Sequence, residues 1–596
     1  MTLGCLRIVH RSRLLLAARG CAILFAILMA GLPWPALAAS PIAGVAVSPA
    51  TASVSSGGAV YLRAAVQGAG DFDRRVTWSL TPGNAGSVSP TGLFISHPAF
   101  TGDASVKATS VENPICSGAA AITVAAGAGV VHVDLNNGGD EDGSALHPYR
   151  TIQGALEHAA ADNTIKVAQG TYTENVALPM FGVLLLGGFK GGSAAEYAAN
   201  QPGDFVTRST DHATQVTTIQ SPSLNNPVVA MLDNWDPPNA LTYAVDGFTL
   251  TGGANGVAVA GSGQIGFFIS QNLITDNGTA VSDASAMGGG IRILGGSPVI
   301  LNNQVSNNQT GWGGGLYING MVNSSYLVQG NIIENNRAGS DRAGGVWLTG
   351  PAGLFTWNLV RGNRCGTLLT YGYGGGLLVN GGQVELNRNV YANNETPYLG
   401  GGLHIEEGAD AVLYHELIYK NASSGSGGAG VSAAGENTQV AANHCTITGN
   451  TAPGIGGNGL KVLEGQVQVS NSIIWGNSGR ELYVQPGATF AMTYSNSQFY
   501  PGTGNINQRP LFANPAADDY HLKSTKGRWN PVKSRWVSDQ EHSPCIDAGN
   551  PAAPFDQEPI PNGGRVNMGV YGNTPEASKS QQDLTISAIL NLLLGD

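Results

Sequence analysis

Charged residues, cysteines and long apolar runs are all scarce in this chain of 596 residues. Only 12% of the residues are charged and six are cysteine. The apolar run from Cys21 to Leu32 is too short to span a bilayer, and no cysteine–histidine set has metal-ligand spacing. The composition therefore excludes a membrane-spanning helix and a cysteine-based metal centre. Hydrophobic residues make up 42% of the chain, enough to bury a core, which a disordered chain lacks.

Residues 1–38 have the pattern of an export signal peptide. Arginines precede the apolar run, and Ala36-Leu-Ala38 offers a small-residue cleavage site. We therefore expect a secreted or cell-surface bacterial protein with no transmembrane segment after cleavage. Loss of four arginines would take the formal net charge from -11 to -15, which disfavours nucleic acid as a partner.

Glycine and asparagine are abundant, and the asparagines are regularly spaced. Gly-rich entries to apolar strands, such as Gly288-Gly-Gly-Ile291 and Gly400-Gly-Gly-Leu403, share one period with an asparagine series. The steps of that series are 31, 28, 27, 31, 27, 29 and 27 residues. Its members are Asn277, Asn308, Asn336, Asn363, Asn394, Asn421, Asn450 and Asn477. A period of this size indicates a stacked repeat architecture.

Each repeat has room for two or three short strands and no helix, which excludes leucine-rich repeats and propeller blades. The pattern predicts an all-β protein, a right-handed parallel β-helix (solenoid) over residues 191–500. Asparagines at matched turns can hydrogen-bond to one another up the stack. Asparagine also tolerates the left-handed backbone that a sharp bend requires. We therefore interpret the series as scaffold.

The cysteine spacing favours buried thiols over disulfides. Export permits disulfides, but Cys365 and Cys445 are 80 residues apart, which corresponds to three repeats. Three steps of about 4.8 Å place them roughly 14 Å apart, too far to bridge.

Residues 41–126 predict a small β-sandwich. Short alternating strands, such as Val76-Thr-Trp78 and Val106-Lys-Ala108, are separated by Gly, Pro and Ser. With Val47-Ser-Pro49 and Ser89-Pro-Thr-Gly-Leu-Phe94, the segment resembles bacterial immunoglobulin-like (Ig-like) domains. The resemblance implies an Ig-like sandwich that acts as a spacer.

The segments on either side of the repeats resemble known β-helix proteins. At residues 130–190, His147-Pro-Tyr-Arg-Thr-Ile-Gln-Gly-Ala-Leu156 resembles the N-terminal entry of secreted bacterial parallel β-helix proteins of the pectate-lyase-like superfamily. In that family a helix covers the open coil end, and helical spacing predicts one at 151–160. His542-Ser-Pro-Cys-Ile-Asp-Ala-Gly-Asn-Pro551 resembles the closing segment of bacterial surface β-helix proteins, which implies a C-terminal cap at 501–580. An amphipathic tail at 581–596 is expected to dock on the coil.

Strand alternation predicts one outward-facing stripe, because the residue after each inward aliphatic side chain points out. Its members are Arg292, Tyr317, Trp347, Leu378, His404, Ser432, Lys461 and Tyr483. Exposed rings stack on sugars, and cations pair with uronate carboxylates. We therefore expect polysaccharide binding or adhesion. The expected ligand-binding residues are Arg292, Trp312, Tyr317, Trp347, Tyr371, Tyr398 and Lys461. Alternatively, bulky side chains only cover glycine-rich backbone, and the protein is a structural surface rod.

Catalysis is the other open interpretation. Tyr373, His404 and Arg342 are the best candidates for the base and the carboxylate-binding cation of a polysaccharide lyase acting on an acidic polymer. Paired acids for a glycoside hydrolase are sparse, since Glu406 and Glu407 are adjacent and face opposite ways. The sequence favours a protein that is not an enzyme.

An acidic loop offers one candidate metal site. Asp134, Asp140 and Asp142 could bind calcium through oxygen ligands, although a plain polar turn is the alternative. No other cofactor is expected. The sequence leaves open the particular glycan, the mode of anchoring and the oligomeric state.

Overall fold

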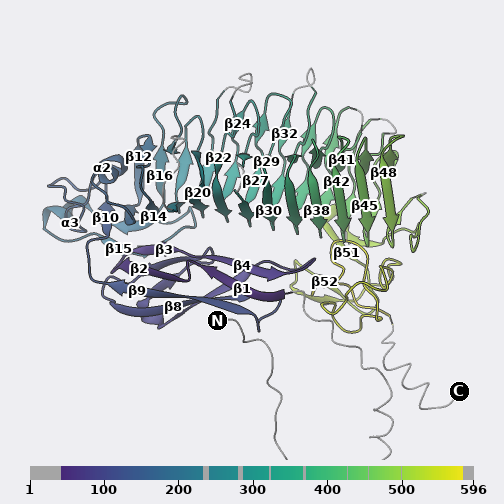
Figure 1. Ribbon diagram of the computed structural model, residues 1–596, viewed down its shortest axis with the longest axis horizontal. Helices are drawn as coiled ribbons and strands as arrows, with labels where there is room; N and C mark the ends of the chain where they lie inside the picture. Colours follow the sequence, from purple (N-terminus) through teal and green to yellow (C-terminus); the bar gives the residue numbers. More distant parts are fainter. Residues whose placement is uncertain are drawn as a thin grey trace, which may run out of the picture. The chain divides into compact units, whose positions relative to one another are not determined.

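The computed structural model describes residues 42–231, 240–279, 286–320, 324–366, 371–425, 427–453, 456–498 and 500–581, with backbone only at 262–264. The predicted signal peptide lies outside the described residues, as does the predicted tail beyond residue 581. The described chain is a β-sandwich followed by a parallel β-helix, so the predicted all-β fold class is confirmed (Figure 1). None of the described helices is long and apolar enough to cross a membrane.

The sandwich consists of three small sheets, ordered β1-β4, β2-β9-β8-β5 and β3-β7-β6. Its core contains Phe94, Val106 and Ile122, with Trp78 packed against them. A short 3-10 turn, η1, covers Gly83–Ala85. The strands are β1 (Ile42–Ser48), β2 (Thr51–Ser55), β3 (Ala59–Tyr61), β4 (Arg63–Gly68), β5 (Val76–Thr81), β6 (Gly86–Val88), β7 (Leu93–Ser96), β8 (Gly102–Ser110) and β9 (Ser117–Ala125).

Each coil of the β-helix passes through up to four strand positions, called columns A to D here. Strands within a column pair in parallel from coil to coil. Column A contains β13 (Val176–Ala177), β17 (Val229–Met231), the first halves of β20 (Val257–Ser270) and β22 (Ile291–Leu301), β25 (Leu316–Asn319), β29 (Val346–Thr349), β33 (Leu377–Asn380), β37 (Leu403–Glu406), β41 (Val431–Ala433), β44 (Leu460–Val462) and β47 (Leu482–Val484).

Column B contains β10 (Val130–Val133), β11 (Asn163–Ala168), β14 (Val183–Gly191), β18 (Leu241–Asp246), the second halves of β20 and β22, β26 (Tyr326–Gln329), β30 (Ala352–Thr356), β34 (Gln383–Asn387), β38 (Asp410–Tyr414), β42 (Gln439–Asn443), β45 (Gln466–Ser470) and β48 (Thr489–Thr493). The strand β15 (Asp204–Arg208) pairs antiparallel with β14 outside this series.

Columns C and D complete the coil. Column C contains β12 (Gly170–Thr173), β16 (Thr217–Gln220), β19 (Thr249–Thr251), β21 (Leu273–Thr275), β23 (Gln304–Ser306), β27 (Ile332–Glu334), β31 (Leu359–Arg361), β35 (Val390–Ala392), β39 (Leu417–Tyr419), β43 (Thr446–Thr448), β46 (Ile473–Trp475) and β49 (Asn496–Ser497). Column D contains β24 (Gln309–Thr310), β28 (Arg337–Ala338), β32 (Arg364–Cys365), β36 (Glu395–Thr396) and β40 (Ala422–Ser423).

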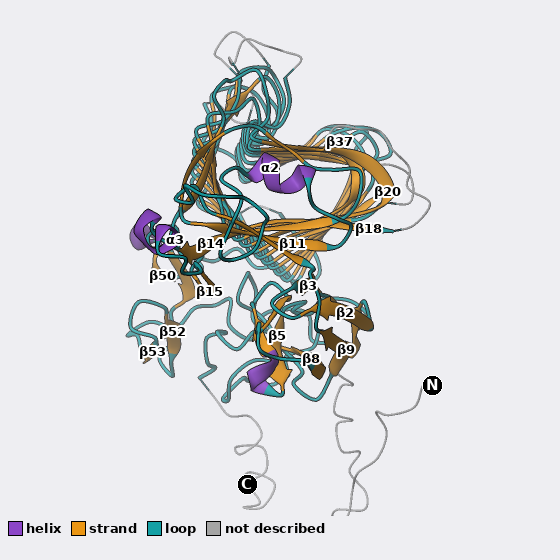
Figure 2. Cartoon of the chain, turned by 90° about the vertical axis from the view of Figure 1, so that its left-hand side faces the viewer, coloured by secondary structure: helices purple, strands orange, loops and turns teal. Residues whose placement is uncertain are grey.

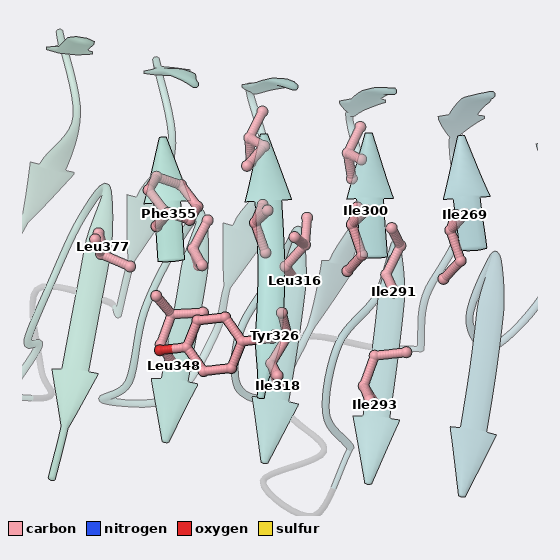
Figure 3. Close-up of a cluster of buried hydrophobic side chains, with 14 of the residues drawn as sticks. Ile269, Ile291, Ile293, Ile300, Leu316, Ile318, Tyr326, Leu348, Phe355 and Leu377 are labelled. Carbon is pink, nitrogen blue, oxygen red and sulfur yellow. The ribbon is translucent and has the colours of Figure 1, made fainter. Parts of the chain in front are cut away.

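Inward-facing aliphatic side chains stack into one continuous core. Figure 3 shows Ile291, Leu316 and Leu348 from column A together with Ile300 and Phe355 from column B. All five are fully buried. The predicted inward positions of the repeat are therefore correct, and the buried thiols of Cys365 and Cys445 also lie within the coils.

The asparagine series forms the expected hydrogen-bonded ladder. The backbone N–H and side-chain amide of Asn336 both donate to the Oδ1 of Asn363, each at 3.0 Å. The same amide donates to the carbonyl of Val305, 2.9 Å away in the preceding coil. The ladder ends where Asn477 donates to Glu481 at 2.6 Å. Each asparagine thus satisfies backbone and side-chain groups in two neighbouring coils.

A second ladder runs five residues earlier in each coil. Its asparagines hydrogen-bond in the same way and are Asn272, Asn303, Asn331, Asn358 and Asn389. Glu416 takes the next position and accepts from Asn389. Cys445 follows in the next coil and its N–H donates to the hydroxyl of Ser472, whose own N–H donates to the hydroxyl of Ser495. The asparagine period in the sequence identified only the first of these two ladders.

The predicted left-handed backbone of the ladder asparagines was wrong. The left-handed residue is the one before each of them, with φ between 53° and 74°, as at Asp276, Asn307, Asn335 and Asn393. The bend needs one residue at positive φ to reverse the chain direction, and the next residue then turns its amide into the coil. Residues before the second ladder are also left-handed, including Trp357, Arg388 and His415.

A short helix lies across the N-terminal end of the coil (Figure 2). This helix, α2, spans Ile152–Glu157 and buries Ile152 and Leu156 against the first strands. The carboxylate of Glu174 accepts the N–H groups of Ile152 and Gln153 at 2.9 Å each, which anchors the helix N-terminus. A second helix, α3 (Ala194–Ala198), begins with a capping box at Ser193 and Glu196.

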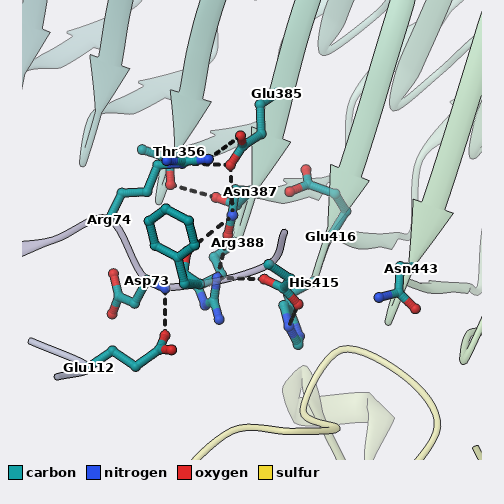
Figure 4. A network of polar contacts seen from close by, with 12 residues as sticks. Asp73, Arg74, Glu112, Thr356, Glu385, Asn387, Arg388, His415, Glu416 and Asn443 are labelled. Atoms are coloured by element: carbon teal, nitrogen blue, oxygen red, sulfur yellow. Dashed lines mark hydrogen bonds and ion pairs between the residues drawn. The ribbon is translucent and has the colours of Figure 1, made fainter. Parts of the chain in front are cut away.

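The sandwich contacts the coils directly through polar side chains. Arg74 donates through Nε to Glu385 at 2.7 Å (Figure 4), and Arg388 pairs with Asp71 at 3.2 Å. His415 lies 2.5 Å from the second oxygen of Asp71. Polar side chains of column B and of the turns that follow it therefore hold the sandwich.

The C-terminal segment packs on the later coils. It contains β50 (Phe512–Asn514), the 3-10 turn η2 (Pro515–Ala517), β51 (Asp519–Leu522), β52 (Arg528–Asn530) and β53 (Arg535–Val537). Leu522, Ile546 and Met568 pack on Ile473 of column C. Tyr500 packs on Phe490 of the last coil. This segment therefore covers apolar surface that the last coils would otherwise expose.

Candidate functional site

The predicted stripe is continuous in the structure. Column A pairs Arg292 with Tyr317, Tyr317 with Trp347, and His404 with Ser432, and the remaining members follow in the same register. The pairings through Leu378, Lys461 and Tyr483 complete the stripe. The asparagine period thus gave the right register for side chains far apart in sequence.

The expected exposure of the stripe was wrong for its central members. Leu378, His404 and Ser432 have no exposed surface, and Tyr317 is 6% exposed. In each coil, the segment that leads into the column A strand, called the return segment here, lies over column A. Three residues before most column A strands a glycine has φ near 63° to 72°, as at Gly313 and Gly400, whereas Ala343 takes this position before β29. The lack of a side chain at these glycines allows contact with the stripe, since a Cβ on Gly400 would lie 2.7 Å from the Cβ of His404.

Rings from the return segments and from the stripe form what we call the aromatic band. Adjacent rings contact each other edge to face: Tyr317 and Trp347 have centroids 5.0 Å apart, and Trp312 and Trp347 5.4 Å. Further along, Tyr398 lies 5.5 Å from Tyr373 and 5.0 Å from Tyr371. The band consists of Trp312, Tyr317, Arg342, Trp347, Tyr371, Tyr373 and Tyr398.

Arg342 joins the two halves of the band. Its guanidinium lies 6.0 Å from the centre of the Trp347 ring and 5.4 Å from that of Tyr373. These are cation–π distances. Tyr371 is 67% exposed, whereas Trp312, Trp347, Tyr373 and Tyr398 are half-buried. The band therefore combines partly exposed rings with one positive charge.

The three candidate catalytic residues come together where Arg342 and Tyr373 of the band meet the buried His404. The rings of Tyr373 and His404 are 5.2 Å apart, and Arg342 forms an ion pair with Glu406. Glu406 also lies 3.2 Å from Nε2 of His404 and accepts from Asn380 at 3.0 Å. Glu406 thus belongs to this cluster, although sequence reasoning discounted it. The signal was its position two residues after His404 in one strand, which puts both on the same face.

His404 is held as a neutral, internally bonded ring. Its Nδ1 lies 2.6 Å from the hydroxyl of Ser432, and Nε2 faces Glu406. Burial, together with the positive charge of Arg342, lowers the pKa of His404 to about 3. Burial also raises the pKa of the Tyr373 phenol. Both nitrogens of His404 are engaged, and the ring has no exposed surface.

Two predicted ligand residues lie outside the band. Arg292 is in register with Tyr317, one coil before the first ring. Lys461 lies beyond Ser432, with its Nζ 5.6 Å from the centre of the Tyr483 ring. The structure therefore gathers five of the seven predicted ligand-binding residues and leaves these two at the ends of the stripe.

The acidic loop is not arranged as a metal site. Asp134 is fully buried, and its Oδ2 accepts from Tyr197 at 2.7 Å and from the Gly192 N–H at 2.8 Å. The carboxylate of Asp142 accepts from the Ser144 N–H instead. Within the described ranges, no group of three His, Cys, Asp or Glu side chains is placed to hold a metal ion. Asp134 therefore ties the acidic loop to the loop before α3.

Comparisons with known proteins match two parts of the chain. Residues 136–348 match a family model described as a protein of unknown function (DUF1565), and residues 410–549 match one described as disaggregatase related. Among solved structures, the chain is similar to the pectate lyase Pel9A at 12% identity, over 74% of this chain and 95% of that chain, with a TM-score of 0.36. No curated protein matches.

The coils themselves define the class of protein. They make the chain a parallel β-helix protein, as its sequence predicts. Because unrelated activities recur on one fold, function has to be argued from the aromatic band and the cluster around His404.

Proposed function

We propose that this protein is secreted or displayed at the cell surface and binds an extended polysaccharide along the aromatic band, without cleaving it. The supporting observation is the unbroken run of rings and Arg342 over consecutive coils. A polymer lying along the coil axis would meet a ring at each step. Rings stack on sugar faces, and Arg342 can pair with a carboxylate of an acidic sugar.

Unused hydrogen-bond donors in this region also support binding. The indole N–H groups of Trp312 and Trp347 and the Nε of Arg292 are buried without a hydrogen-bond partner among the described residues. Buried donors are normally paired. Small movements of these side chains on binding would let sugar hydroxyls accept from them.

The cluster around His404 supports binding over catalysis. A lyase base must reach a substrate proton, whereas both nitrogens of His404 are bonded inside the protein. Glu406 is paired with Arg342, so it is not free to act as a catalytic acid or base. The convergence of Tyr373 with Arg342 is the observation that favours a lyase as the second candidate.

Affinity measurements with variant proteins test the binding proposal. We expect wild type to be retained on at least one member of a panel of acidic and neutral polysaccharides. Trp347→Ala and Tyr371→Ala should each weaken binding about tenfold, which corresponds to roughly 1.4 kcal/mol. Trp529→Ala, in the β52–β53 hairpin, is the matched control and should bind as wild type. Equal retention of all four proteins would refute the proposal.

Product formation tests the second candidate. Incubation with uronate polymers should give no ultraviolet absorbance from unsaturated sugar. A rise in absorbance that Tyr373→Phe abolishes would instead establish a lyase and would replace the binding proposal.

A further inference from the structure

A separate cavity lies where the sandwich meets the first coils. Its volume is about 510 Å³, within the range of small-molecule sites. The sandwich contributes residues 83–84, 86–87 and 95–100 to the walls, and the coil side contributes Lys166 and Val206. Pro98 and Phe100 are apolar, whereas Asn84 and Ser87 carry polar side chains. The cavity lies outside the aromatic band, which is built from later coils.

Lys166 is the buried charged residue of this cavity. It lies on β11 between Ile165 and Val167, which are fully buried in the coil core, so its own side chain points out of the coil. Nevertheless it is only 2% exposed. Its Nζ donates to the carbonyl of Phe205 at 3.1 Å. An ammonium group has three donors, so one carbonyl does not satisfy it.

No described carboxylate neutralises this ammonium group. The charged side chain that acts on Lys166 is Arg208, which is itself cationic and is paired with Asp246 at 2.5 Å. The remaining neighbour is the Phe189 ring, whose centre is 5.2 Å from Nζ. Burial and, to a lesser extent, Arg208 lower the pKa of Lys166 to about 8. Buried charges in proteins are normally paired, so this arrangement lacks its anion.

We propose that this cavity binds a small carboxylate-bearing ligand, such as a single uronic acid, whose carboxylate pairs with Lys166. Asn84 and Ser87 offer hydrogen bonds to hydroxyl groups, and Phe100 and Pro98 offer an apolar wall. The anion would restore the charged form of Lys166 that burial disfavours. This site requires neither the polymer nor the aromatic band.

Titration of the full-length protein with D-glucuronate tests the site, with D-glucose as the neutral match. The probe is the Cε resonance of lysine labelled with carbon-13. In the free protein one lysine should titrate near pH 8. Glucuronate should move that midpoint upward by at least about one unit, since an adjacent opposite charge favours the charged form. Glucose should leave it unchanged.

Variant proteins distinguish binding of glucuronate at Lys166 from its binding elsewhere on the protein. Lys166→Met should weaken glucuronate binding at least about tenfold, as expected for loss of a charge-assisted pair. Lys107→Met, an exposed lysine of β8, should bind as wild type. Trp347→Ala should also keep glucuronate binding, so that failure of the band and failure of this cavity are distinguishable.

Two results would overturn the proposal. The first is an equal response of Lys166 to glucose and to glucuronate, or no response to either at millimolar concentration. The second is wild-type affinity for glucuronate in Lys166→Met. The lysine titration uses the wild-type protein, so it decides the matter even if Lys166→Met does not fold.

Discussion

Glu416 is the residue at which the second ladder changes chemistry. It occupies the position of a ladder asparagine and accepts from the backbone and side chain of Asn389 at 3.1 Å each. Burial raises its pKa to about 8, although the bonds from Asn389 act in the opposite direction. At neutral pH the carboxyl group is therefore mostly protonated. It behaves as a neutral member of a ladder of neutral amides.

This gives a prediction for Glu416→Gln. The folded pKa lies above the ordinary value of 4.5, so the folded state holds a proton that the unfolded state has lost. The free energy of unfolding must then fall as pH rises from about 4.5 to about 8. Glutamine keeps an acceptor and removes this loss. The variant should be more stable than wild type at pH 8, by on the order of 2 kcal/mol.

Urea unfolding at pH 6, 7 and 8 measures the effect. The difference between Glu416→Gln and wild type should grow with pH, while the exposed control Glu436→Gln should show a constant difference. Parallel curves for the two variants would show that Glu416 is not protonated in the fold.

Single residues also show which structural properties the sequence could not predict. Alternation along a strand identified Tyr317 and His404 as members of one outer face, because side-chain direction is a local property. It could not give their burial, which depends on return segments such as the one containing Gly400. For the same reason Glu406 was discounted. Its partner Arg342 lies 64 residues away in sequence.

At the scale of the element, the turn is the unit that repeats. A left-handed residue reverses the chain and the next asparagine bonds to two coils, as in the pair Asn335 and Asn336. The two asparagines look alike in sequence but have different roles. The first supplies backbone conformation and the second supplies hydrogen bonds.

Substitutions at this pair should separate the two roles. Asn336→Ala removes the acceptor of Asn308 and the donors to Val305 and Asn363. Because it strands buried polar groups, we expect a loss of about 2–4 kcal/mol. Asn335→Gly keeps the positive φ that glycine adopts readily and should change stability by less than about 1 kcal/mol.

Denaturant unfolding of both variants, with amide hydrogen exchange in the neighbouring strands, measures this contrast. Exchange protection should fall in β23, β27 and β31 for Asn336→Ala alone. Equal losses for the two variants would show that the side-chain bonds of the ladder contribute little.

The period predicted the first ladder because eight equivalent positions carry the same residue type. The second ladder escaped detection since its later positions are Glu416, Cys445, Ser472 and Ser495. Carboxyl and hydroxyl groups can replace an amide as acceptor. A search for one repeated residue type cannot find a ladder whose members differ in residue type and share only their hydrogen bonding.

At the scale of the whole described chain, ion pairs tie the sandwich to the coils. Asp71 pairs with Arg388 and His415, and all three side chains are at most 13% exposed. Burial would raise the pKa of Asp71, but His415 and Arg388 outweigh that effect and hold it well below its usual range. This group therefore stabilises the fold above about pH 4, and the stabilisation is lost as the pH falls further.

Removing this charge should loosen the contact between sandwich and coils. We expect Asp71→Asn to cost about 3 kcal/mol at neutral pH, because it leaves Arg388 without its counter-charge in a mostly buried position. The exposed control Asp103→Asn should cost less than about 1 kcal/mol. The cost of Asp71→Asn should shrink progressively below about pH 4, where the carboxylate becomes protonated in the unfolded wild-type chain.

Chemical unfolding at neutral pH and at pH 3 tests this prediction. Hydrogen exchange of β4 and β5 provides a local readout. A neutral-pH stability that is unchanged in Asp71→Asn would show that packing alone holds the sandwich in place.

The sandwich meets the coils at several separated points, among them Asp246, Trp357 and His415. The sandwich is not repetitive, and it contacts the repeating coils at fixed positions. It therefore fits only one number of coils between those positions. Gain or loss of one coil between Asp246 and His415 would displace every later contact residue by about 4.8 Å and break its pairing with the sandwich. Repeat arrays can otherwise lengthen or shorten by whole units. Between Asp246 and His415, the number of coils can therefore change only if the sandwich changes with it.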